Sequence, residues 1–460
     1  MKPSQSKPRR PSPAAPKGRK AAAETSPDKA PLDIRLAAFL LWLLILVPPF
    51  LFYPLAKESF RQPKLLASGW FALASLIPLA LGLYRQKEVE FSRLFRSRAF
   101  LAVLPVVAVA WAGVLTTRHP LHVEEALKDL WIGAACLVGW SLALPAARLE
   151  RLLLGLLIPA TLLGALGILQ FTGLWQPLSF LGLEMDARLA MTSTAGNPGD
   201  LGVYLVLPCL LAQWRLLKAL RTGDPPAPGV LAVAGPLAVC LAALLLTQTL
   251  AALAALAAGS LLFWALVLPR RRALLAGAGL AAAAVVLVLA VAPLRERVVA
   301  KARQAMAGDW NAVLTNRLDG WRTAVWMLEK SPWTGVGHGA YRPEFVPAKL
   351  ALLSRGAEFS PDLQQQVVFA NAHNEYLEVG AEWGIPGLLA LAWALGVLVY
   401  ALRRGAEPPG DRALAWAGSA ALAVLSLAHF PFRIALVAFP ALLFLSWVMR
   451  RSAEGEEEEP

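Results

Sequence analysis

The chain has 460 residues, of which 57% are hydrophobic and only 16% are charged, and its formal net charge at pH 7 is +13. Because soluble domains carry roughly 25% charged residues, this composition excludes an ordinary cytosolic enzyme. The apolar residues fall in blocks of about 20, the length of a membrane helix, separated by short basic stretches. Basic loops between membrane helices explain the positive charge, so no nucleic-acid partner is expected.

Residues 1–33 are rich in Pro, Lys and Arg and contain no apolar run, which predicts a disordered cytoplasmic tail. The rest of the chain predicts an all-α polytopic membrane protein with about twelve transmembrane helices. The bias of Lys and Arg toward alternate connections favours an N-in/C-in orientation. The twelve apolar spans are expected at about residues 36–56, 66–84, 99–116, 130–147, 152–170, 200–215, 230–247, 249–269, 273–293, 381–402, 413–429 and 433–449.

These spans predict a simple domain organisation. Transmembrane helices 1–9 occupy residues 34–293, helices 10–12 occupy residues 381–449, and residues 450–460 form an acidic cytoplasmic tail. Between the two groups of helices, residues 294–380 form one long periplasmic loop with short helices. In a protein whose other loops are tight, such a segment is where function is expected.

The positions of ionisable residues narrow the function. Such residues inside a membrane mark ion or proton paths, and the interiors of the predicted spans contain essentially none, which argues against a pump or an ion channel. The H-x-x-H pair of His119 and His122 is interrupted by Pro120 in an irregular loop, so no metal site is predicted. All five histidines fall on the predicted outer face: His119, His122, His338, His373 and His429.

His373 is the candidate for proton transfer. It lies in the stretch NAHNEYLEVGAEWGIPG, just before a predicted membrane helix, and Asn371, Asn374 and Glu375 flank it. An imidazole can accept a proton from a hydroxyl nucleophile, and a neighbouring amide or carboxylate can orient it. The alternative interpretation is that the Asn-His-Asn sequence only caps the helix. Spacing alone does not separate the two interpretations.

Several arginines are expected near the same outer face. Arg317 and Arg322 lie in the long loop, Arg188 precedes the span at 200–215, and Arg433 lies at the start of the last span. Guanidinium groups form paired hydrogen bonds to phosphate oxygens, so this group of arginines suits a lipid-linked pyrophosphate. The alternative is ordinary ion pairing at the surface, for example between Arg317 and Asp319.

Three stretches of the chain resemble the O-antigen ligase and O-antigen polymerase superfamily. RLAMTSTAGNPGDLGVYL (188–205), which contains Asn197, is similar to the family's Arg…Asn-Pro segment at the start of a span. NRLDGWRTAVWMLEKSPWTGVGHGAY (316–341) resembles its Arg–Trp helix followed by Pro-x-x-Gly-x-Gly-x-Gly. AHNEYLEVGAEWGIPGLL (372–389) is similar to its His-Asn-x-x-Leu…Gly-x-x-Gly signature.

This resemblance implies a GT-C-like membrane glycosyltransferase of the bacterial inner membrane that needs no metal or other cofactor. Such an enzyme moves a glycan from an undecaprenyl-diphosphate-linked donor to an acceptor hydroxyl, on lipid A–core for a ligase, at the periplasmic face. His373 then corresponds to the essential loop histidine, a general base, and Arg317 or Arg322 to a catalytic loop arginine. The residues expected to bind substrate are Arg188, Asn197, His338, Asn371, Asn374, Glu375 and Arg433.

One position departs from the family pattern. Many members have a Ser-Arg pair where this chain reads LTQTLAAL, with Leu250 at the arginine position. If that arginine binds diphosphate, Arg188 or Arg433 must replace it, or the activity differs. A polymerase of the same superfamily, which differs in its acceptor, remains an alternative. A lipid-linked glycan flippase would need charged residues inside the bundle, and a membrane scaffold would not need the His and Arg groups.

Overall fold

The structure of the protein is a computed structural model, which describes residues 31–56, 58–85, 91–175, 187–221, 226–360, 369–404 and 408–458. The described residues form helices and connections without a β-strand, as the composition predicts. Most of the predicted basic tail, residues 1–30, lies outside the described residues, and α20 continues into the predicted acidic tail as far as Glu458. The helices that carry the argument below are α1 (Leu32–Leu46), α2 (Arg61–Arg85), α3 (Phe91–Arg96), α4 (Arg98–Ala112), α5 (Pro120–Ala143), α6 (Ala146–Gly155), α7 (Leu157–Phe171), α8 (Ala187–Ala190), α9 (Pro198–Arg221), α10 (Pro226–Thr247), α11 (Leu250–Val267), α12 (Arg270–Ala290), α13 (Ala292–Met306), α14 (Trp310–Val313), α15 (Arg317–Lys330), α16 (Tyr341–Leu353), α18 (Glu375–Arg404), α19 (Pro409–Ala428), η5 (Pro431–Arg433) and α20 (Ala435–Glu458).

Ten of the described helices are long and apolar enough to cross a membrane, which confirms a polytopic membrane protein. They coincide with ten of the twelve predicted spans. The other two predicted spans, 273–293 and 413–429, coincide with α12 and α19, which are helices of 21 and 20 residues but are not among these ten. The number of crossings and the N-in/C-in orientation therefore stay predictions.

Helix α9 forms the centre of the bundle. It packs against α7, α10, α11 and α19, and it is more deeply buried than the other candidate spans. Small residues let the helices approach closely, because lipid tails supply no hydrophobic force between them and close van der Waals contact must hold them together. At Gly259 of α11, for example, a β-carbon would lie 3.1 Å from the carbonyl oxygen of Ala417 on α19.

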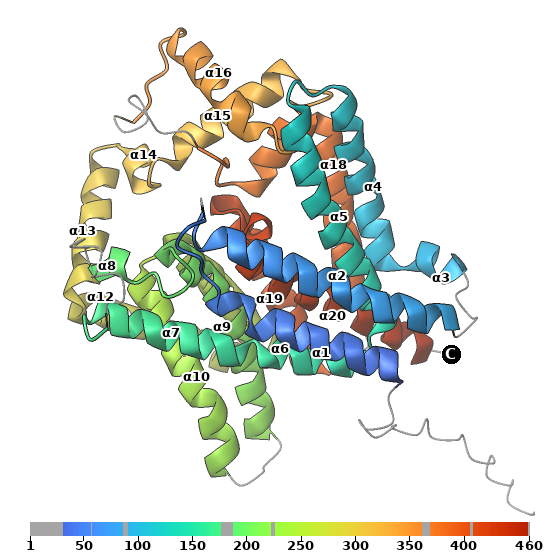
Figure 1. The fold of residues 1–460 in the computed structure, drawn as a ribbon. Helices are drawn as coiled ribbons and strands as arrows, with labels where there is room; N and C mark the ends of the chain where they lie inside the picture. The colour runs from blue at the N-terminus through green and yellow to red at the C-terminus, as the bar shows by residue number, and fades with distance from the viewer. Residues whose placement is uncertain are drawn as a thin grey trace, which may run out of the picture.

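The segment between α12 and α18 folds on one side of the bundle. Figure 1 shows α13, α14, α15 and α16 following one another there, with α15 beside the start of α18. A small core of its own, which includes Met327, Tyr341 and Phe345, packs α15 against α16 and the chain before α18. This core matters because it fixes α15 against the residues that precede α18.

Two glycine-rich stretches meet at a break in α18. Pro386 has no N–H, so the carbonyl of Glu382 four residues earlier loses its helical partner. The structure supplies one: Gly337 N donates to that carbonyl at 2.9 Å, and the neighbouring carbonyl of Ala381 accepts from Val336 N at 2.9 Å. A β-carbon on Gly335 would lie 2.2 Å from the Glu382 backbone, so only glycine fits there. The family-like glycines therefore join the loop to α18.

Candidate functional site

Helix α18 begins with a capped turn, and His373 lies one residue outside it. The Asn374 side chain accepts a hydrogen bond from Leu377 N at 3.0 Å, so Asn374 is the N-terminal cap. His373 itself has φ of 57°, the left-handed region, which costs a non-glycine residue about 1 to 2 kcal/mol. The cap and the histidine are thus separate features of the motif, and His373 is not needed to cap the helix.

The hydrogen bonds of His373 define which ring nitrogen is free. Its Nδ1 lies 3.2 Å from the carbonyl oxygen of Asn371. Because a carbonyl only accepts, this contact assigns the ring proton to Nδ1 and leaves a lone pair on Nε2. Aromatic rings surround the imidazole: the centroids of Phe430, Phe369 and His429 lie 4.9, 5.3 and 6.4 Å from its own. The free nitrogen has the form that a general base requires.

The same surroundings keep His373 neutral. Burial lowers its pKa from 6.5 to about 4, and the positive charges of Arg317 and, to a smaller extent, Arg61 act in the same direction. The hydrogen bond to Asn371 opposes this shift without reversing it. At pH 7 the imidazole is therefore uncharged and able to accept a proton.

Arg317 is a half-buried cation without an ion-pair partner among the described residues. It is the first residue of α15 and follows Asn316, whose backbone is left-handed at φ of 61°. Burial lowers the pKa of the guanidinium, and no hydrogen bond or ion pair joins this group to another residue in the described part of the chain. A charge that loses part of its hydration without gaining a partner is costly, so a cation in this state favours an anionic ligand.

Further cations lie close to Arg317. Burial lowers the pKa of Lys301 on α13, and the charges of Arg297 and Arg317, and more weakly Arg188, lower it further, against an opposite contribution from Asp309. These contributions to the pKa of Lys301 indicate that basic groups of α8, α13 and α15 lie within electrostatic range of it. The sequence analysis identified Arg188 and Arg317 but not Arg297 and Lys301, which lie in the predicted long loop.

Arg188 contacts the part of the chain in which the sequence departs from the family pattern, close to Leu250. Its Nε donates to the carbonyl oxygen of Thr247 at 3.1 Å, at the end of α10. Leu250, the residue at the expected arginine position, begins α11 three residues later. A guanidinium is therefore present beside the α10–α11 connection, but it comes from a different segment of the chain.

A second histidine and a paired arginine complete this region. His429 is buried, and its Nδ1 has no hydrogen-bond partner among the described residues. Arg61 of α2 lies over the ring of Phe430, 5.6 Å from its centroid, and forms a two-pronged ion pair with Asp200 of α9 at 2.9 and 3.0 Å. Arg61 was not among the predicted site residues, because it lies far from them in sequence.

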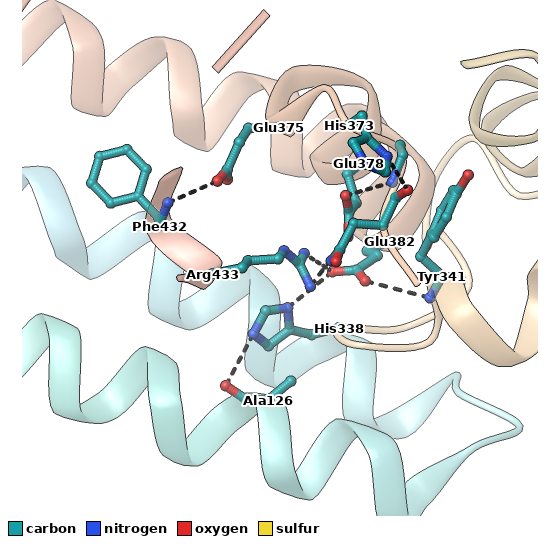
Figure 2. Close-up of polar contacts among 11 residues, drawn as sticks. Ala126, His338, Tyr341, His373, Glu375, Glu378, Glu382, Phe432 and Arg433 are labelled. Atoms are coloured by element: carbon teal, nitrogen blue, oxygen red, sulfur yellow. Dashed lines mark hydrogen bonds and ion pairs between the residues drawn. The ribbon is translucent and has the colours of Figure 1, made fainter. Parts of the chain in front are cut away.

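Carboxylates of α18 form a second network, which Figure 2 shows next to His373. The Arg433 guanidinium lies 3.2 Å from Glu378 and 2.8 Å from Glu382. His338 bridges Glu382, at 3.1 Å, and the carbonyl oxygen of Ala126 on α5, at 3.2 Å. Arg433 is thus bound to two carboxylates, in contrast to Arg317.

The remaining predicted residues contact backbone groups or carboxylates of the protein. Glu375 accepts a hydrogen bond from Phe432 N at 3.0 Å, and Asn371 donates to Glu378 at 3.0 Å. Arg322 is half exposed; it donates to the carbonyl of Glu358 at 2.7 Å and lies 3.7 Å from Asp319. Asn197 is exposed, and its side chain accepts from Gly199 N at 2.6 Å at the start of α9. The basic side chains around His373 form what we call the cationic region: Arg61, Arg188, Arg297, Lys301 and Arg317, together with His429. Of the predicted residues, Arg317, Arg188 and His373 therefore belong to it.

The fold and this region define a multi-pass helical membrane protein with a neutral histidine within electrostatic range of several basic side chains. Residues 235–392, about a third of the chain, match the family model described as O-antigen ligase. The match includes Lys301, Arg317 and His373 and confirms the resemblance to the O-antigen ligase and polymerase superfamily. No curated protein matches the chain.

Proposed function

We propose that the protein transfers a glycan from undecaprenyl diphosphate to an acceptor hydroxyl at the periplasmic face of the bacterial inner membrane, as an O-antigen ligase with lipid A–core as acceptor. One observation carries the proposal: Nε2 of His373 is neutral and keeps its lone pair, and Arg317, which has no ion-pair partner among the described residues, is close enough to lower the pKa of the imidazole. A base within electrostatic range of an anion-binding cation suits transfer from a diphosphate donor.

In the proposed reaction, His373 acts on the acceptor and the basic residues act on the diphosphate of the donor. Nε2 of His373 takes the proton of the acceptor hydroxyl while the hydroxyl oxygen forms a bond to the anomeric carbon of the donor sugar. The bond from that carbon to the diphosphate oxygen breaks, and the diphosphate leaves with the electron pair. Arg317, Lys301 and Arg188 bind the diphosphate and stabilise the charge that it gains as it leaves.

Arg188 supplies the positive charge that Leu250 does not. Its guanidinium bonds to Thr247 beside the α10–α11 connection, whereas Arg433 is occupied by Glu378 and Glu382. Of the two arginines that could replace the family's residue, Arg188 is therefore the better placed. Lys301 and Arg297 of α13 add to the charge on that side of the region.

The test is transfer in vitro by the purified full-length protein in lipid nanodiscs, with an undecaprenyl-diphosphate-linked glycan as donor and excess chelator present. Lipid A–core, a second lipid-linked glycan and a peptide are offered as acceptors in separate reactions. We expect glycosylated lipid A–core from the wild type. Product only on the lipid-linked glycan would make the protein a polymerase instead.

The same assay tests His373. His373→Ala is expected to lower turnover by about 10²- to 10⁴-fold, the usual effect of removing a general base, and to leave donor binding nearly unchanged. The matched control is His119→Ala, which removes a histidine that bonds to Glu344 at 2.9 Å, away from the cationic region. Transfer by His373→Ala at the wild-type rate would refute the proposed role.

A further inference from the structure

The carboxylate of Glu378 holds the turn that carries His373. Its Oε2 accepts a hydrogen bond from Ala372 N at 2.8 Å, and its Oε1 accepts one from the Asn371 side chain at 3.0 Å. Asn371 and Ala372 are the two residues immediately before the histidine. Figure 2 shows Glu378 directly beside His373, on the first turn of α18. The Glu378 side chain is fully buried, so water does not compete for either bond.

The neighbouring carboxylates on α18 have different partners. Glu375 accepts from Phe432 N, and Glu382 contacts His338 and Tyr341 N. The three carboxylates lie along one side of the helix, because their spacings of three and four residues correspond to about one turn. Among the described residues, Glu378 is the member of this series that bonds to the turn at 371–373.

The conformation of His373 explains why such a restraint is needed. A left-handed backbone at a non-glycine residue persists only where surrounding contacts hold it. After the histidine, the Asn374 cap fixes the start of α18. Before it, the two bonds to Glu378 fix Asn371 and Ala372, and Asn371 in turn supplies the carbonyl that binds Nδ1 of His373. Arg433, 3.2 Å from Glu378, compensates the buried negative charge.

We propose that Glu378 is a positioning residue for His373: it fixes the preceding turn, and through it the direction in which Nε2 points. The inference rests on the proposed function, because the direction of Nε2 matters only if His373 acts on a substrate. Glu378 does not touch the substrate, so its removal misaligns the base without weakening the binding of the donor.

The first experiment compares Glu378→Gln and Glu378→Asp with the wild type in the transfer assay. A glutamine side chain has one acceptor oxygen instead of two, so at least one of the two bonds is lost. We expect kcat of Glu378→Gln to fall about 10- to 100-fold while KM for the donor stays within about threefold. Glu378→Asp keeps the charge and both oxygens and should recover part of the loss. Wild-type kcat in Glu378→Gln would overturn the proposal.

The matched control is Asp411→Asn. Asp411 is also a buried carboxylate, 1% exposed, with an arginine partner, Arg451, at 2.7 Å, but it lies at the start of α19, outside the region around His373. It should lower thermal stability and keep kcat within about threefold. If Asp411→Asn lowers kcat as much as Glu378→Gln does, loss of a buried ion pair explains both, and the positioning role is wrong.

The second experiment is a double-mutant cycle with His373→Ala. A residue that acts through His373 has nothing to position once the imidazole is gone, so Glu378→Gln should cost less than about twofold in the His373→Ala protein. A full additional loss would show that Glu378 acts on the fold in general, and the proposal would fail.

Amide hydrogen exchange of the full-length protein gives a measurement independent of activity. In Glu378→Gln, peptides that contain residues 370–374 should exchange at least tenfold faster, with peptides from α9 unchanged. Unchanged exchange at 370–374 would overturn the inference. If the wild type transfers no glycan to any acceptor but exchange rises as expected, the proposed function fails and the restraint on the turn stands.

Discussion

The carbonyl oxygen of Ala372 lies directly against Gly320, where an added β-carbon would be 3.1 Å from it. This contact joins the turn that carries His373 to α15, the helix that begins with Arg317. A glycine inside a helix costs roughly 1 kcal/mol relative to alanine, so Gly320 is unfavourable for α15 alone. Its place in the helix is explained by the close approach of the two segments, which brings the histidine and the arginine together.

Gly320→Ala should therefore lower activity more than stability. The new methyl group would press on Ala372 O and on the Phe369 ring, both 3.1 Å away, so the turn must move by a few tenths of an ångström. We expect a three- to tenfold loss of turnover, because a small displacement of a base is costly, with the melting temperature nearly unchanged. The control is Gly279→Ala on α12, which meets no atom within 4 Å. Equal turnover in the two variants would contradict the argument.

The membrane helices could be predicted from sequence because the signal is local: about 20 apolar residues in succession are enough. The predicted count of twelve includes α12 and α19, which are not among the ten candidate spans of the described residues. His373 and the loop arginines could be identified from short motifs. The choice between Arg317 and Arg322 could not, because it depends on which side of α15 faces the turn at 371–373.

The rest of the region comes from tertiary packing. Arg61 and His429 lie more than 50 residues from His373 in sequence, and no local pattern relates them to it. The same holds for Arg188, which meets Thr247 across 59 residues. Sequence spacing also could not show that Arg433 is held by Glu378 and Glu382, while Arg317 has no such partner among the described residues.

The difference in ion pairing between Arg433 and Arg317 predicts that their replacement will have different effects on stability. Arg433→Gln leaves two buried carboxylates without their cation and should destabilise the protein by about 3 kcal/mol. Arg317→Gln removes a half-buried charge that has no ion-pair partner among the described residues, and should leave stability unchanged or raise it, while donor binding and turnover both fall. Arg317→Lys should recover activity only in part, because an ammonium lacks the paired donors. Thermal unfolding of the detergent-purified variants, with transfer assays alongside, measures both effects; destabilisation by Arg317→Gln equal to that by Arg433→Gln would contradict this assignment.

The orientation in the membrane can be tested across a single helix. Ser354 is exposed at the end of α16, and Arg404 is exposed at the end of α18, so one membrane span separates them. If residues 294–380 are periplasmic, Ser354→Cys should react with an impermeant thiol reagent in cells whose outer membrane is permeabilised, and Arg404→Cys should react only after lysis. The three native cysteines are buried and give the background. Labelling of Arg404→Cys alone would reverse the orientation.

The pH dependence of stability and activity should show how the charge of Arg317 affects the pKa of His373. The pKa of the free protein's imidazole is about 4, below its ordinary 6.5, because of burial and then the charge of Arg317. Between these two pH values the unfolded chain binds more protons at His373 than the folded chain does. The contribution of His373 to the free energy of unfolding therefore decreases as the pH falls from about 6.5 to about 4.

The pH dependence of activity should also depend on the charge of Arg317. The profile of kcat/KM reports the free protein and should keep its plateau down to a pH well below 6.5. A bound diphosphate offsets the charge of Arg317, which raises the pKa of His373 in the complex. The acid limb of kcat should therefore lie at higher pH than that of kcat/KM. Arg317→Gln removes the same charge from the free protein, so its kcat/KM limb should shift upward and the gap between the two profiles should narrow. Steady-state transfer rates from pH 4 to pH 8 measure both limbs. Identical limbs for kcat and kcat/KM in the wild type, unmoved by Arg317→Gln, would mean that the base is not exposed to this charge and is a group other than His373.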